Sequence, residues 1–140
     1  MIRIEDAPWK EMVRHARAAY PGECCGAMLG QILEDGSKLV REALPFENAR
    51  ADRERGYRYE VQPQALLQAE GEAPGKGMEL LGLYHSHPDS GAHFSETDLK
   101  NSCPWFSYVI LSIKAGEFDH AGSWLPDFEQ TRADREELIY

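Results

Sequence analysis

Two histidines, a serine and an aspartate follow one another in the pattern H-x-H, seven residues, S-x-x-D, formed by His85, His87, Ser95 and Asp98. The apolar run 80–84 leads into the first histidine and predicts a strand that ends in a polar loop. Alternate side chains of a strand share one face, so His85 and His87 should point the same way. Two imidazoles on one face suit zinc, which binds histidine nitrogen at about 2.0–2.1 Å. A pair of surface or hydrogen-bonded histidines is the alternative.

The second half of the pattern has two compatible interpretations. Ser95 and Asp98 form the S-x-x-D capping box that begins a helix, while Asp98, in the first turn, can still face the histidines. His85, His87 and Asp98 would give zinc three protein ligands and leave one position for water or substrate, as in catalytic sites. Such a site retains one net positive charge and can act as a Lewis acid.

A hydrolase also needs a general base, and the sequence contains no HExxH motif that would place it beside the ligands. Glu23 is the best candidate, because it lies at the start of an apolar, glycine-punctuated segment (24–33) that predicts a buried strand. A carboxylate there would be partly desolvated. An ordinary solvated glutamate in a turn is the alternative.

These residues together resemble the signature of the JAMM (MPN-plus) zinc metalloproteases, over residues 1–125. The resemblance implies that His85, His87 and Asp98 bind one zinc ion, that Glu23 is the general acid and base, and that Ser95 stabilises the oxyanion. It also implies a curved mixed β-sheet flanked by helices, in a cytidine-deaminase-like fold. One departure is visible, since the residue before the serine is often proline in the family and is phenylalanine here.

The family cleaves amide or isopeptide bonds after the C-terminal Gly-Gly of ubiquitin or ubiquitin-like proteins. The chain is similar to small, stand-alone bacterial members, which act on ubiquitin-like sulfur-carrier proteins in sulfur transfer or cysteine synthesis. A tail without side chains can lie extended in a narrow groove and add to a sheet edge. The charged segment 47–58 is expected to be a mobile loop, either forming one wall of this groove or simply solvated.

Two other functions remain open on the residues alone. The first is a non-catalytic scaffold that keeps zinc for stability, with His93 as a fourth ligand, since structural zinc sites have four. His15 and His120 are poorer ligand candidates and are expected at the surface. The second is a zinc hydrolase of small amides, which would have a small closed pocket in place of a groove.

Composition narrows the class of protein. A chain of 140 residues fits one domain, with 126–140 as a loosely packed tail or an edge strand. The net charge of −9 speaks against nucleic acid as a partner, because phosphate binding needs a basic surface. An acidic surface of this kind keeps a protein soluble, suits a salty cytoplasm, or binds a basic protein partner. No apolar run is long enough for a membrane span or signal peptide, so a cytoplasmic location is expected. The three cysteines predict reduced core thiols.

Hydrophobic periodicity and turn residues predict alternating strands and helices, and therefore an α/β fold with a mixed sheet. The predicted strands are 2–4, 24–33, 38–44, 57–61, 78–87, 108–113 and 121–125, with 138–140 as a further edge strand. The predicted helices are 6–20, capped by Asp6, then 63–73 and 95–103.

Overall fold

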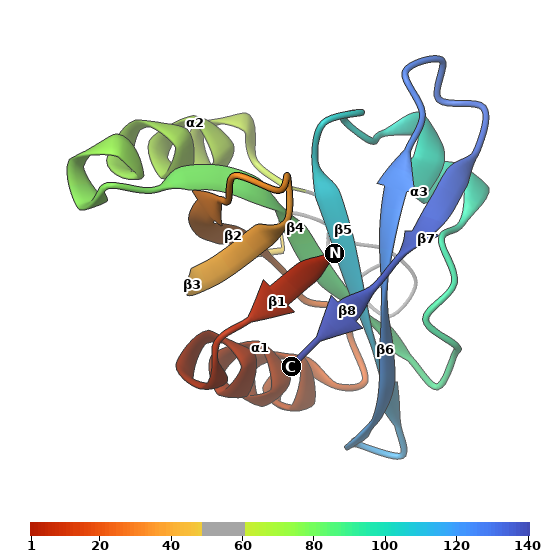
Figure 1. The fold of residues 1–140 in the computed structure, drawn as a ribbon. Helices are drawn as coiled ribbons and strands as arrows, with labels where there is room; N and C mark the ends of the chain where they lie inside the picture. Colours follow the sequence, from red (N-terminus) through yellow and green to blue (C-terminus); the bar gives the residue numbers. More distant parts are fainter. Residues whose placement is uncertain (49–60) are drawn as a thin grey trace.

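The computed structural model describes residues 1–48 and 61–140 (Figure 1). The charged loop predicted at 47–58 lies outside these residues except for 47 and 48, and the strand predicted at 57–61 lies outside them except for 61. Among the described residues no helix is long and apolar enough to cross a membrane.

Eight strands form one mixed sheet in the order β7-β6-β5-β4-β2-β3-β1-β8. In chain order they are β1 (Ile2–Ile4), β2 (Cys25–Ile32), β3 (Lys38–Phe46), β4 (Glu79–Pro88), β5 (Ser107–Lys114), β6 (Glu117–Pro126), β7 (Ala133–Glu136) and β8 (Leu138–Ile139). β4 pairs antiparallel with β2 and parallel with β5, which makes it an interior strand with a neighbour on each side. The prediction of an α/β fold with a curved mixed sheet flanked by helices is confirmed.

In the described part of the chain, three α-helices and one short 3₁₀ helix accompany the sheet: α1 (Asp6–Ala19), α2 (Pro63–Glu72), η2 (Pro74–Lys76) and α3 (Glu96–Lys100). In Figure 1, α1 lies on one side of the sheet and α2 on the other. Met12 and Ala16 of α1 pack in one hydrophobic cluster with Met28 and Tyr84, whereas Ala69 of α2 packs in a second cluster with Leu83 and Phe106.

The period of two along β4 decides which side chains reach each layer. Tyr84 faces the α1 cluster and Leu83 faces the α2 cluster, so from Leu83 onward residues at odd positions lie on the α2 side of the strand. Before an irregularity in the pairing with β2 the alternation is reversed, with Leu81 in the α1 cluster. Gly82 allows β4 to approach β5 closely, because a Cβ atom there would lie 1.9 Å from the carbonyl oxygen of Ser107.

Some predicted element boundaries are wrong, for local reasons. Helix α1 begins at Asp6 rather than being capped by it, because Glu5 occupies the N-cap and its backbone N–H bonds to the Val40 carbonyl. Helix α3 is shorter than the predicted 95–103. The side-chain amide of Gln130 donates to carbonyl groups at the end of α3, including that of Ser102 at 2.7 Å, and satisfies them in place of a further helical turn.

The terminal segment joins the two edges of the curved sheet. β7 pairs with β6 at one edge, and after a single residue, Glu137, β8 pairs with β1 at the other (Figure 1). β7 lies in the segment 126–140, for which the sequence predicts a loosely packed tail or an edge strand without giving the strand's bounds. Its sequence, Ala-Asp-Arg-Glu, lacks hydrophobic alternation, and charged residues are typical of edge strands.

Candidate metal centre

The carboxyl end of β4 presents two histidines to the α2 side of the sheet. His85 and His87 share the face of Leu83, as the alternation of the strand requires, while Ser86 faces the opposite way. His85 is completely buried and His87 is 8 % exposed. The predicted co-facial arrangement of the two imidazoles is therefore present.

Helix α3 brings the carboxylate of Asp98 to the histidines. The Ser95 hydroxyl accepts a hydrogen bond from the Asp98 backbone N–H, and the Ser95 N–H donates to Asp98 Oδ2, both at 3.0 Å. This is a complete capping box. Because the same oxygen, Oδ2, also faces the histidines, Asp98 both caps the helix and joins the polar cluster, as the sequence predicts.

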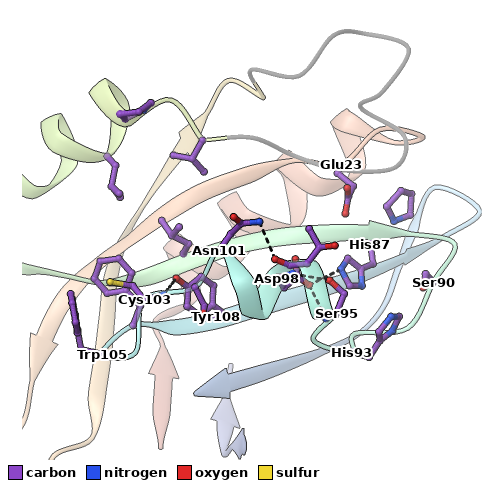
Figure 2. Close-up of a pocket in the computed structure, with 18 of the residues that line it drawn as sticks. Glu23, His87, Ser90, His93, Ser95, Asp98, Asn101, Cys103, Trp105 and Tyr108 are labelled. Carbon is purple, nitrogen blue, oxygen red and sulfur yellow. Dashed lines mark hydrogen bonds and ion pairs between the residues drawn. The ribbon is translucent and has the colours of Figure 1, made fainter. Parts of the chain in front are cut away.

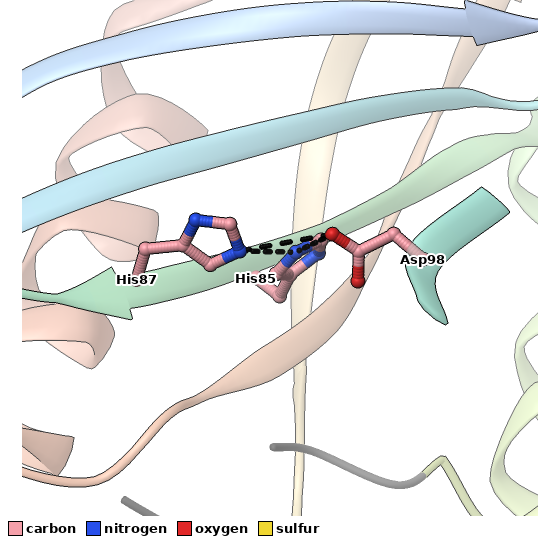
Figure 3. A group of neighbouring side chains, drawn as sticks. All are labelled: His85, His87 and Asp98. Carbon is pink, nitrogen blue, oxygen red and sulfur yellow. Dashed lines mark hydrogen bonds and ion pairs between the residues drawn. The ribbon is translucent and has the colours of Figure 1, made fainter. Parts of the chain in front are cut away.

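Three potential ligand atoms converge at this point (Figure 3). The Nε2 atoms of His85 and His87 lie 3.2 Å apart, and Asp98 Oδ2 lies 3.4 Å from the first and 3.7 Å from the second. Ligand atoms of a tetrahedral zinc site with bonds of about 2.0–2.1 Å are about 3.3–3.4 Å apart. The triangle thus has the dimensions of three corners of such a site, and the donor set fits zinc.

The environment favours the protonation state that a metal requires at His85 and Asp98, whereas at His87 the effect of burial is outweighed by the hydrogen bonds to Asp98 and Gly91, which raise its pKa. Burial lowers the pKa of His85, which favours its neutral, metal-binding form. Burial would raise the pKa of Asp98, but its hydrogen bonds with His85 and His87 outweigh burial and hold this pKa well below the usual range. The aspartate is therefore ionised at neutral pH.

His87 is held in one tautomer by the loop that follows β4. Its Nδ1–H donates to the carbonyl of Gly91 at 2.8 Å, since a carbonyl can only accept. The lone pair of the neutral ring is then on Nε2, the atom that faces His85 and Asp98. Such a hydrogen bond to the second ring nitrogen is typical of metal-binding histidines.

Glu23 lies at the same site, just before β2. The antiparallel register pairs Cys25 with His85, and extending it by two residues places Glu23 opposite His87 on the same face. Glu23 is 7 % exposed and lines the same groove as His87 and Asp98. The carboxylate of Glu23 is therefore largely removed from solvent, as predicted, and the alternative of a solvated glutamate in a turn is wrong.

The peptide group between Glu23 and Cys24 is hydrogen-bonded at both ends. Its N–H, on Cys24, donates to the Ser86 hydroxyl at 2.9 Å, and its carbonyl, on Glu23, accepts from the side-chain amide of Asn48 at 3.0 Å. Ser86 also donates its own backbone N–H to the Cys24 carbonyl at 3.1 Å. The backbone that carries Glu23 is thus tied directly to the strand that carries the histidines.

A groove of about 960 Å³ leads away from the cluster. Figure 2 shows Glu23 and His87 at one end of this groove, and Cys103 and Trp105 at the other. Between them the walls include Leu66 of α2 and Thr97 and Asp98 of α3. The cluster therefore lies at the end of a long channel with an apolar far end, rather than in a small closed pocket.

Comparison with known proteins agrees with this arrangement. The family model of prokaryotic homologues of the JAB domain matches residues 6–125. The chain belongs to this family. The resemblance to the JAMM (MPN-plus) signature is thereby confirmed at the level of the JAB/MPN family.

Individual relatives of this JAB domain support the same assignment. A desampylase from Haloferax volcanii is 32% identical over 120 residues, which cover 83% of this chain and 82% of the relative. A solution structure of a protein from Desulfitobacterium hafniense has a TM-score of 0.84 and 29% identity, covering 99% of this chain and 92% of that one. A JAB1/MPN domain protein from Archaeoglobus fulgidus, at 15% identity and a TM-score of 0.59 over the whole of both chains, shows the fold.

Other histidines and the cysteines lie outside the metal-binding group of this JAB domain. Among the described residues that group contains His85, His87 and Asp98, and His93 is not part of it, although its ring centroid is 5.2 Å from that of His87. His15 is half-buried on the α1 side and hydrogen-bonds the Tyr84 hydroxyl. All three cysteines are free, as predicted.

The sequence did not reveal the residues that hydrogen-bond the backbone around this site. Ser86 lies inside the H-x-H pattern, but its orientation away from the metal gave no reason to assign it a role. Asn48 and His120 belong to no recognisable sequence motif. Each contacts a backbone group more than twenty residues away, and such a contact leaves no pattern in the local sequence.

Proposed function

We propose that this protein is a zinc-dependent peptidase that hydrolyses the amide bond after the C-terminal Gly-Gly of a ubiquitin-like protein. The observation that carries the proposal is the convergence of two imidazole nitrogens and one carboxylate oxygen beside a buried glutamate, at the end of a groove. The similarity to a desampylase supports the class of substrate.

His85, His87 and Asp98 would hold the zinc ion, and three protein ligands match the number in catalytic sites. When bound there, zinc supplies a Lewis acid that polarises a carbonyl and makes water more acidic. With His93 outside the group, the described residues offer no fourth ligand in it, which favours catalysis over a zinc-containing scaffold.

Glu23 acts as the general base and then as the general acid. It takes one proton from the attacking water as the water oxygen bonds to the substrate carbonyl carbon. It returns that proton to the leaving nitrogen as the C–N bond breaks, which balances the reaction. Its burial at the end of the groove excludes bulk water from this exchange.

Ser95 donates to the oxyanion that forms on the former carbonyl. Its oxygen already accepts from the Asp98 N–H, which fixes the position of the hydroxyl without using its hydrogen. The hydrogen can therefore be directed into the groove, which Ser95 lines.

The groove favours an extended peptide over a small amide. Its length and apolar far end suit a protein tail that leads its last carbonyl to the cluster. The narrower prediction, a sulfur-carrier protein whose terminal glycine carries a cysteine or short extension, stays a prediction. Parallel digestion of a ubiquitin-like protein carrying a short C-terminal peptide and of an isopeptide-linked conjugate would test it.

The Glu23→Gln variant tests the mechanism. It should still bind about one zinc per chain, and its hydrolysis of a ubiquitin-like protein extended beyond Gly-Gly should fall by about 10²–10⁴-fold. Zinc is measured by elemental mass spectrometry and cleavage by protein mass spectrometry, with and without a chelator. Glu72→Gln, on the exposed side of α2, is the matched control and should retain activity. Undiminished cleavage by Glu23→Gln would remove Glu23 from the mechanism.

A further inference from the structure

One peptide group connects His87 to a histidine two strands away in the sheet. The carbonyl of Gly91 accepts from His87 Nδ1–H at 2.8 Å. The N–H of Ala92, which belongs to the same peptide group, donates to Nε2 of His120 at 3.1 Å. His120 lies on β6, two strands away from β4.

The tautomer of His120 is set by its neighbour Asp119. His120 Nδ1 lies 2.6 Å from Asp119 Oδ2, and the hydrogen bond from His120 lowers the pKa of this carboxyl. An ionised carboxylate can only accept, so the ring proton is on Nδ1 and the lone pair is on Nε2. This is the arrangement that the Ala92 N–H requires.

We propose that His120 is a positioning residue for the metal centre, acting on His87 through the Gly91–Ala92 peptide group. The hydrogen bonds run in series from Asp119 through His120 and the peptide to His87. Hydrogen bonds in such a chain polarise one another, so acceptance of the Ala92 N–H makes the Gly91 carbonyl a stronger acceptor. A stronger acceptor on Nδ1–H makes Nε2 a better ligand and fixes the ring plane.

Burial sets the size of the effect. Ala92 is 8 % exposed, but the His120 side chain is 44 % exposed, so water can replace part of its hydrogen bond. Loss of a direct partner of a metal-binding histidine costs about 10–100-fold in metal affinity. His120 acts one peptide further away, and we expect its loss to weaken zinc binding about threefold to tenfold, less than that range.

A role in merely anchoring the loop would predict a different result. Ser112 anchors the same loop from β5 by donating to the Ser90 carbonyl, and it pairs with His120 in the register of β5 and β6. Its hydroxyl does not touch the Gly91–Ala92 peptide. Ser112→Ala is therefore a matched control that loosens the loop without breaking the chain of hydrogen bonds to His87.

Two substitutions at His120 separate the roles of its ring nitrogens. Glutamine places its amide oxygen near the position of Nε2 and can still accept from Ala92, whereas asparagine reaches only the position of Nδ1. We expect the zinc dissociation constant of His120→Asn to rise threefold to tenfold and the visible absorption bands of its Co²⁺ form to shift. His120→Gln should stay within about twofold of the wild type.

The inference rests on the proposed metal site but not on the proposed hydrolysis, and zinc binding is measured by competition with a chelator. Thermal unfolding of the metal-free variants shows that each one is folded. Ser112→Ala should lose thermal stability while keeping the zinc affinity and cobalt spectrum of the wild type. Tight zinc binding by His120→Asn, or equal weakening by Ser112→Ala, would overturn the role of His120 alone. A wild-type protein that binds no zinc would overturn this inference together with the metal site.

Discussion

Replacing Ser86 with alanine should impair hydrolysis without releasing the metal, because the Ser86 hydroxyl faces away from the histidines that flank it. It accepts the N–H of Cys24 at 2.9 Å, and this N–H belongs to the peptide group that begins at Glu23. Both Ser86 and Cys24 are nearly inaccessible, at 1 % and 2 % exposure. In the variant, water cannot readily reach the amide left behind.

The cost in stability follows from this burial. A buried hydrogen-bonding group left without a partner costs about 1–3 kcal/mol. For a chain of this length, about 1 kcal/mol corresponds to roughly 3–4 °C, so the melting temperature should fall by about 3–12 °C. Because the fold is otherwise intact, the unfolding transition should remain cooperative.

The cost in activity follows from the position of Glu23. With the N–H end of its peptide group released, Glu23 is held less firmly at that peptide, and a displacement of about 1 Å in a catalytic group can cost 10²-fold. We expect kcat to fall by about 10- to 100-fold at saturating zinc. The zinc dissociation constant should stay close to that of the wild type.

Ser123→Ala is the matched control, since it removes a fully buried serine hydroxyl that hydrogen-bonds Glu136 at 2.9 Å, outside the groove. It should lower the melting temperature while leaving kcat unchanged. Unchanged kcat in Ser86→Ala would refute the reasoning. So would a loss of zinc affinity that accounts for the whole loss of activity, because Ser86 would then act on the ligands rather than on Glu23.

Three further predictions concern the ligands, the α1 side of β4 and its close approach to β5. Asp98→Ala should weaken zinc binding more than about 100-fold, beyond the effect of losing an indirect partner, and unchanged zinc content would restrict Asp98 to helix capping. Burial lowers the pKa of His15 in the folded protein. When the pH falls below the ordinary histidine pKa of about 6.5, this side chain is therefore protonated more readily in the unfolded chain, and the free energy of unfolding decreases. His15→Asn, which can still accept from Tyr84, should flatten this decline in urea unfolding between pH 7 and 5, and an identical slope would contradict the assignment. Gly82→Ala should destabilise the protein by about 1–3 kcal/mol or more because its Cβ meets a backbone carbonyl, whereas Gly71→Ala, in open space on α2, should be neutral or stabilising.

The features predicted correctly from the sequence are those whose cause is local. The apolar run before His85 predicts the strand, and the alternation of side chains along any strand predicts the shared face of the histidines. The S-x-x-D spacing predicts the cap of α3 because a capping box needs only residues within one helical turn. The end of α3 could not be predicted in the same way, since Gln130, which accounts for it, lies about thirty residues further along the chain.

The remaining determinants of the site act on backbone groups, which carry no sequence signal. The peptide groups Glu23–Cys24 and Gly91–Ala92 carry the proposed base and contact a proposed ligand, yet a hydrogen bond to a peptide group does not depend on which side chain the residue bears. Ser86 and His120 reach these groups only because the sheet pairs β4 with β2 on one side and with β5, and through it β6, on the other. An interior strand can be braced in this way from both directions, whereas an edge strand has a neighbour on one side only. The position of β4 within the sheet therefore accounts for the fixed geometry of its terminal histidines, and changes at Ser86 and at His120 should affect the base and the ligand separately.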